Sequence, residues 1–202
     1  MLASSPISAL LLVVNILTTC YVLFMDPRAM DRFALKPYRV KQDQEAYRLL
    51  TSVLVHVNMG HLLVNMVTLF FFGPALEYQL GPIGFLALYL GSDLASGALS
   101  MIKHHDDAWY SSVGASGAIS GVVIAYALFY PLRPIYMMFI PIGIPAIVFA
   151  GLYIGFSAWA AKDQRPGSIA HIAHLGGALG GLLITVILEP SILTHFIRML
   201  TY

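Results

Sequence analysis

Hydrophobic residues occupy six long stretches of the chain, separated by short runs that hold charged residues, glycine or proline. The stretches cover residues 6–25, 58–76, 83–102, 114–131, 135–160 and 169–188. Each approaches or exceeds the roughly 20 helical residues that cross a hydrocarbon layer of about 30 Å. Backbone polar groups in lipid have to be hydrogen-bonded within their own segment. The pattern therefore predicts an all-α membrane protein, a bundle of six transmembrane helices without strands.

The connections between the six stretches are short, with the exception of residues 26–57. In this first loop, charged side chains are interleaved with Met, Phe, Leu and Tyr, which is typical of an amphipathic segment in the membrane interface. Gly81-Pro82 predicts a sharp turn between the second and third spans. No Lys or Arg precedes the first stretch, so we interpret it as a retained span and not a signal peptide. We expect a single membrane domain over residues 1–202.

The composition supports a lipid environment. Of the 202 residues, 58% are hydrophobic and only 10% are charged, whereas a soluble domain carries about 25% charged residues. The 11 Lys and Arg residues are nearly balanced by 10 Asp and Glu residues, which argues against the basic surface that nucleic-acid binding requires. Cys20 is the one cysteine, so an intrachain disulfide is excluded.

Unusual polar residues lie near the starts of three spans. His61 and Asn65 belong to the second span, Ser116 to the fourth, and His171 and His174 to the sixth. Because successive spans run in opposite directions, these three spans begin on the same side of the membrane. We therefore expect the five side chains to lie at similar depth below one membrane face.

Small residues on two of these spans favour close packing. Gly117 and Gly121 on the fourth span, and Gly177 and Gly181 on the sixth, are each four residues apart, a spacing that lets helices approach tightly. His174 precedes the sixth-span glycines by three and seven residues, so it shares their helical face. Packing of the two faces would bring the serine of the fourth span to this histidine.

Each polar residue alone has an ordinary structural explanation. A serine in a transmembrane helix is usually inert, because it bonds back to the preceding turn or serves as a small packing residue. A histidine in lipid is rarer and more often functional. Together they suggest nucleophilic catalysis, in which Ser116 needs a base and His174 is available as a neutral imidazole. His61 and Asn65, four residues apart, would offer hydrogen-bond donors to an oxyanion.

Other functions have weaker support. The histidines suggest a metal site, but no H-E-x-x-H occurs and we expect no metal. A solute transporter would be favoured by repeated halves or by several acidic residues within spans, and only Asp93 is of that kind; we assign it no role. Residues 114–118 are not the G-x-S-x-G nucleophile elbow, because Ala118 stands at the last position.

Four motifs, in order along residues 45–181, resemble the rhomboid family. The family patterns are E-x-W-R-x-x-T…H…H-x-x-x-N-M, G-x-x-x-E-x-x-x-G, G-x-S-G and A-H-x-x-G-x-x-x-G. Their counterparts are Glu45–Thr51 with His56 and His61–Met66, then Gly73–Gly81, Gly114–Gly117 and Ala173–Gly181. Tyr47 stands where the family usually has Trp, and Ser120 where some members have an aromatic residue that stacks on the catalytic histidine.

The resemblance implies an intramembrane serine endopeptidase of the compact six-helix, bacterial type. Ser116 would be the nucleophile and His174 the general base, with His61 and Asn65 at the oxyanion. The substrates would be single-span membrane proteins in the bilayer, without a cofactor or metal, in a prokaryotic inner membrane. A non-catalytic rhomboid-like protein that binds membrane clients is the alternative, and it would be expected to lack the nucleophile or the base.

Two arguments about topology disagree. The resemblance places the N-terminus in the cytoplasm and the active site on the outer side. Most Lys and Arg residues, however, lie in the loops on the active-site side, and counting basic residues places that side in the cytoplasm. We follow the resemblance, because the long first loop also carries acidic residues and is expected to lie in the interface.

Overall fold

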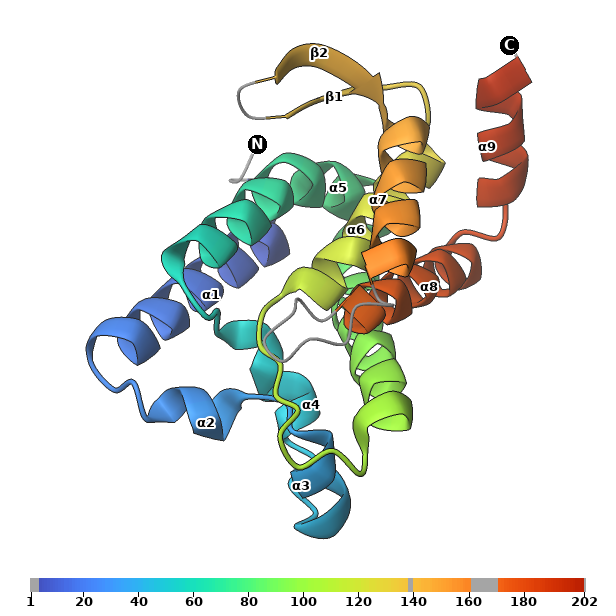
Figure 1. Cartoon of the computed structure of the whole chain (residues 1–202). Helices are drawn as coiled ribbons and strands as arrows, with labels where there is room; N and C mark the ends of the chain where they lie inside the picture. The colour runs from blue at the N-terminus through green and yellow to red at the C-terminus, as the bar shows by residue number, and fades with distance from the viewer. Residues whose placement is uncertain (1–3, 138–139, 161–170, 202) are drawn as a thin grey trace.

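The computed structural model describes residues 4–137, 140–160 and 171–201, and these residues form a mostly helical molecule (Figure 1). Its larger helices are α1 (Pro6–Phe24), α5 (Met59–His104), α6 (Ser116–Phe129), α7 (Ala146–Ala160), α8 (His171–Leu188) and α9 (Ile192–Thr201). Residues 161–170 lie outside the described residues. They include the start of the predicted sixth span, and also Lys162 and Arg165, two of the basic residues in the topology argument.

Three described helices, α1, α5 and α8, are long and apolar enough to cross a membrane. Helix α5 contains the predicted second and third spans, and it is interrupted at Gly81, where φ is +70°. Glycine tolerates this left-handed backbone because it has no Cβ, and the following Pro82 cannot donate a backbone hydrogen bond. The predicted turn at Gly81-Pro82 therefore lies where the helix breaks.

Helix α6 is shorter than the predicted span over 114–131. Its 14 residues rise roughly 21 Å at about 1.5 Å per residue, less than the thickness of a hydrocarbon layer. Every residue of α6 after Ser116 is buried. Its largely apolar sequence thus reflects burial among other helices, chiefly α5 and α8 (Figure 1). This result shows why hydrophobic length alone overestimates the extent of a central helix.

The prediction of a helix from residue 135 is wrong, as is the expectation that the chain has no strands. Strands β1 (Pro134–Met137) and β2 (Ile140–Pro145) pair in antiparallel orientation, and helix α7 begins only at Ala146. Pro141 and Pro145 lack the backbone N–H that a helix requires. In a two-stranded sheet both strands are edges, where proline is tolerated.

The first loop is folded into several short helical elements. These are α2 (Ala29–Phe33), α3 (Pro37–Gln42), α4 (Arg48–Thr51) and the 3-10 helix η2 (Ser52–Leu54). The side chain of Arg48 is 2% exposed. Its Nη1 donates to the carbonyl oxygens of Asp31, Arg32 and Ala34 at 2.6, 3.1 and 2.7 Å, and Nε donates to Glu45 at 2.5 Å. One buried guanidinium thereby joins the successive turns of the loop.

Two further contacts join distant parts of the chain. Leu35 of the first loop pairs with Ser112 through two backbone hydrogen bonds of 2.9 and 3.0 Å, which attaches the loop to the segment that precedes Ser116. Helix α9 lies beyond the last predicted span and was not expected. Nε2 of its His195 lies 2.9 Å from the carbonyl oxygen of Phe129 at the end of α6.

Candidate functional site

Ser116 is the first residue of α6, and the backbone before it is shaped by a glycine. Gly114 has φ +120°, and a Cβ on it would lie 2.4 Å from Cε1 of His61. Only glycine therefore fits beneath the His61 ring. No side chain caps the helix at Ala115. The N–H groups of the first turn of an α-helix have no partner within the helix, so the site contains backbone donors next to the serine.

Helices α6 and α8 touch through their glycines, as the small-residue spacing predicts. A Cβ on Gly177 would lie 2.0 Å from the carbonyl oxygen of Gly117, and one on Gly181 would lie 2.3 Å from Cα of Gly121. A Cβ does not approach other atoms so closely, so the two backbones meet only because these positions lack side chains. This contact sets the distance between the serine and the histidines.

The Ser116 hydroxyl meets one of the two histidines of α8. Oγ of Ser116 lies 2.9 Å from Nε2 of His174, within ordinary hydrogen-bond distance. His171, one turn earlier, packs edge-to-face against His174 with ring centroids 5.7 Å apart. The pair Ser116–His174 thus has the geometry of a hydroxyl and the base that accepts its proton.

His61 and Asn65 lie on the first turns of α5. The His61 ring covers Gly114, two residues before Ser116. The Asn65 side chain is buried, and its Nδ2 donates to the carbonyl oxygen of His61 at 3.0 Å. The structure thus brings His61 to the site, whereas the Asn65 amide is bonded to its own helix.

His56 belongs to the first of the four family motifs, and the sequence alone assigns it no role. It is fully buried, and its Nε2 accepts the backbone N–H of Ala115 at 3.2 Å. The proton of the neutral ring therefore sits on Nδ1, which donates to Thr19 Oγ1 at 3.0 Å. Burial, and secondarily the neighbouring His61, lowers the pKa of His56 to about 3. His56 is thus a neutral support for the residue that precedes Ser116.

An aromatic ring does lie against His174, although Ser120 of α6 is not aromatic. The ring comes from Tyr153 of α7, with centroids 6.0 Å apart and planes inclined by 25°. The hydroxyls of Tyr153 and Ser120 are 2.5 Å apart, and Ser120 Oγ donates to the carbonyl oxygen of Ser116 at 2.6 Å. The sequence carried no signal for Tyr153, because nothing local relates it to α8.

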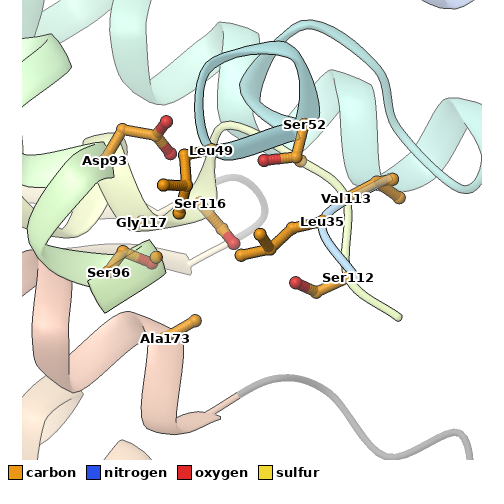
Figure 2. A pocket seen from close by; sticks show the side chains of 12 residues that line it. Leu35, Leu49, Ser52, Asp93, Ser96, Ser112, Val113, Ser116, Gly117 and Ala173 are labelled. Atoms are coloured by element: carbon orange, nitrogen blue, oxygen red, sulfur yellow. The ribbon is translucent and has the colours of Figure 1, made fainter. Parts of the chain in front are cut away.

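The Ser116 hydroxyl points into a pocket between the first loop, α5 and the start of α6 (Figure 2). Polar residues of this pocket include Ser52, Asp93, Ser96 and Ser112. Asp93 is buried, and its Oδ2 has no hydrogen-bond partner among the described residues. In the described part of the chain, no three His, Cys, Asp or Glu residues are grouped so that they could hold a metal ion.

Comparison with known proteins places these residues in a family. The Rhomboid domain family matches residues 43–191. The putative rhomboid protease YdcA of Bacillus subtilis is 33% identical over 142 residues, which are 70% of this chain and 66% of that protein. The RHOMBOID-like protein 12, mitochondrial, of Arabidopsis thaliana is 29% identical over 147 residues, 65% of this chain and 43% of that protein. The mitochondrial rhomboid protein 1 of Saccharomyces cerevisiae is 32% identical over 144 residues, 65% of this chain and 39% of that protein.

The matched region thus covers less than half of each of the two mitochondrial relatives. It includes all four sequence motifs together with Ser116 and His174. The apolar helices α1, α5 and α8 fit an integral membrane protein. The chain belongs to the rhomboid family.

Proposed function

We propose that this protein is an intramembrane serine endopeptidase that cleaves membrane proteins through a Ser116–His174 dyad. The observation that carries the proposal is the distance of 2.9 Å between Ser116 Oγ and His174 Nε2. Membership of a family that includes proteins named as proteases supports it. The contact between α6 and α8 at Gly117 and Gly177 supports it further, because it holds the two reacting groups on helices in backbone contact.

The proposed reaction is acyl transfer. His174 accepts the proton of Ser116 as Oγ attacks the scissile carbonyl carbon, and it then donates this proton to the leaving amine. Water, deprotonated by the same imidazole, hydrolyses the acyl-enzyme and restores the serine. Formation and hydrolysis of the acyl-enzyme therefore use the same atom, Nε2 of His174, to accept and donate the proton, and neither step needs a cofactor or metal.

The negative charge on the carbonyl oxygen would be stabilised at the start of α6. The backbone N–H of Ser116 lies in the first helical turn, where unpaired donors and the helix dipole favour an anion. His61, whose ring lies over Gly114, would donate as well. Asn65 Nδ2 has two N–H groups: one donates to the His61 carbonyl oxygen at 3.0 Å, and the other would donate to the oxyanion.

The proposed substrates are single-span proteins of the same bilayer. Their transmembrane segment would have to expose its backbone to Ser116, and the pocket in front of the hydroxyl provides space lined by Leu35, Leu49 and polar side chains. The residues 1–202 would act as one membrane domain, in a prokaryotic inner membrane, with the active site on the outer side.

The proposal is tested with purified protein in detergent and in proteoliposomes. Wild type, Ser116→Ala, His174→Ala and His171→Ala are compared for labelling by a fluorophosphonate and for cleavage of a model single-span substrate. Wild type and His171→Ala should label and cleave, and the other two should not. Cleavage by Ser116→Ala would overturn the proposal. Substrate binding without labelling or cleavage in the wild type would favour the non-catalytic client-binding alternative.

A further inference from the structure

Helix α7 contacts the rest of the bundle along a stripe of small residues interrupted by one large side chain. Ala146, Ala150 and Ser157 of this helix are buried, while Leu152 and Phe156 are more than half exposed. Tyr153 lies on the buried stripe, one turn after Ala150. Among the stripe residues it has by far the largest side chain, and this side chain contacts Ser120 of α6 and His174 of α8.

From this placement we propose that Tyr153 is a positioning residue that holds the His174 imidazole in its reactive orientation. The inference rests on the proposed function and adds to it a residue outside the dyad and the oxyanion site. Four contacts carry it. Together they form a closed ring through Ser116, Ser120, Tyr153 and His174.

The direction of the hydrogen bonds in this ring follows from the number of protons. Ser120 has a single hydroxyl proton, and it is donated to the carbonyl oxygen of Ser116 at 2.6 Å. Tyr153 is therefore the donor in its contact of 2.5 Å with Ser120 Oγ. The phenol is fixed at its hydroxyl end to the turn that begins at the nucleophile.

The aromatic ring of Tyr153 makes the second contact, with the imidazole of His174. Its plane is inclined by 25° to the imidazole of His174, with centroids 6.0 Å apart, within the range of an offset stacked pair. His171 packs against the same imidazole at 85°, and Phe156 packs against His171 at 85°. Tyr153 and Phe156, three residues apart on α7, thus contact the two histidines that are three residues apart on α8.

Stacking restricts the torsion that matters for catalysis. Rotation of His174 about its Cβ–Cγ bond would carry Nε2 away from Ser116 Oγ, and the Tyr153 ring occupies space beside one face of the imidazole. Because its phenol is also bonded to Ser120, Tyr153 contacts both the helical turn that begins at Ser116 and the imidazole plane of His174. A displacement of reacting groups by about 1 Å is enough to lower a rate by about 100-fold.

Three variants separate the contribution of the Tyr153 ring from that of its hydroxyl. Tyr153→Leu removes the ring, Tyr153→Phe keeps the ring but loses the hydroxyl, and Ser120→Ala removes the acceptor. For Tyr153→Leu we expect kcat to fall by about 10-fold to 100-fold, with KM changed by less than about 3-fold. Tyr153→Phe should recover most of this loss and resemble Ser120→Ala, each within about 10-fold of wild type.

Tyr126→Leu is the matched control. Tyr126 is a buried tyrosine of α6, and its ring contacts among the described residues are with Phe72 at 4.5 Å and Tyr130 at 5.1 Å, not with the dyad. It should lower the unfolding temperature as Tyr153→Leu does, yet leave kcat unchanged. A drop in kcat of equal size in both variants would overturn the inference, because the effect would then be one of general stability.

A measurement that does not depend on catalytic turnover completes the test. In protein with isotope-labelled histidine, the ring signals of His174 are assigned by their loss in His174→Ala and should shift in Tyr153→Leu through the lost ring current. Unchanged signals and unchanged kcat in Tyr153→Leu would overturn the positioning role while leaving the protease proposal intact. A wild-type protein that neither reacts with the fluorophosphonate nor cleaves the substrate would instead contradict the proposed function itself.

Discussion

Nε2 of His56 accepts the backbone N–H of Ala115, the residue immediately before Ser116, at 3.2 Å. The two residues are 59 positions apart, and the contact links the loop before α5 to the start of α6. His56 also packs edge-to-face on His61 with centroids 5.1 Å apart. One neutral imidazole therefore supports the backbone of the proposed nucleophile and the ring of a proposed oxyanion donor.

We expect His56→Phe to lower the cleavage rate by about 10-fold to 100-fold and to destabilise the fold by about 1–3 kcal/mol. Phenylalanine fills similar space but leaves the buried Ala115 N–H without an acceptor. The rate is measured with a single-span substrate and stability by thermal unfolding. Thr19→Val, which removes the partner of Nδ1 and the 3.4 Å bond from Thr19 to the Leu54 carbonyl oxygen but leaves the acceptor of Ala115 in place, should have a smaller effect on rate. Wild-type kinetics in His56→Phe would contradict this account.

The lowered pKa of His56 predicts a loss of stability in acid. In the folded protein this pKa is about 3, whereas in the unfolded chain it is about 6.5. Between these values the unfolded chain binds a proton that the folded chain does not, so the free energy of unfolding falls as pH falls from about 6.5 toward 3. Unfolding temperatures of wild type and His56→Phe should therefore converge as pH is lowered. Parallel curves would show that His56 does not titrate in this way.

Gly177→Ala should disrupt the contact between α6 and α8. The new Cβ would lie 2.0 Å from the carbonyl oxygen of Gly117, so the helices have to separate. Overpacking of this kind costs about 1–3 kcal/mol, and the dyad distance should grow, with loss of fluorophosphonate labelling. Gly151→Ala is the matched control, because among the described residues no atom outside its own stretch of α7 lies within 4 Å of the new Cβ. It should label at the wild-type rate.

Arg48→Ala should unfold the first loop. It would leave three carbonyl oxygens without their shared donor, and loss of one partner of a buried charged group costs about 3–5 kcal/mol. Limited proteolysis should then cut within residues 26–57. The exposed Arg28 provides a control, since Arg28→Ala should change stability by less than about 0.5 kcal/mol. Equal resistance of both variants to protease would show that Arg48 does not hold the loop.

Glu77→Leu should detach the start of α1. The Glu77 carboxylate accepts the backbone N–H groups of Ile7 and Ser8 at 2.9 and 2.7 Å, and the Ser8 hydroxyl at 2.8 Å. A carboxylate at a helix N-terminus pairs donors that the helix leaves open. We expect a loss of about 1–3 kcal/mol and faster hydrogen exchange of residues 7 and 8. Ser8→Ala, which removes one of the three bonds, should lose less.

Much of the helical order could be predicted from sequence, but not the ends of the elements. The break at Gly81 follows from local chemistry, because glycine before proline disfavours a continuous helix. Strands β1 and β2 do not follow from the sequence, because an apolar run rich in isoleucine suits a buried helix and a strand alike. Helix α6 was predicted too long, since hydrophobicity reports burial and does not distinguish lipid from protein.

The sequence by itself determined which residues of the proposed site share a helical face: His61 with Asn65, and His174 with Gly177. These relations depend only on the 3.6-residue period of a helix. Only the tertiary structure decided that His56 bonds Ala115 and that Tyr153, not Ser120, stacks on His174. Such contacts depend on how whole helices pack, and no local pattern encodes which side chain of a distant element will face the site.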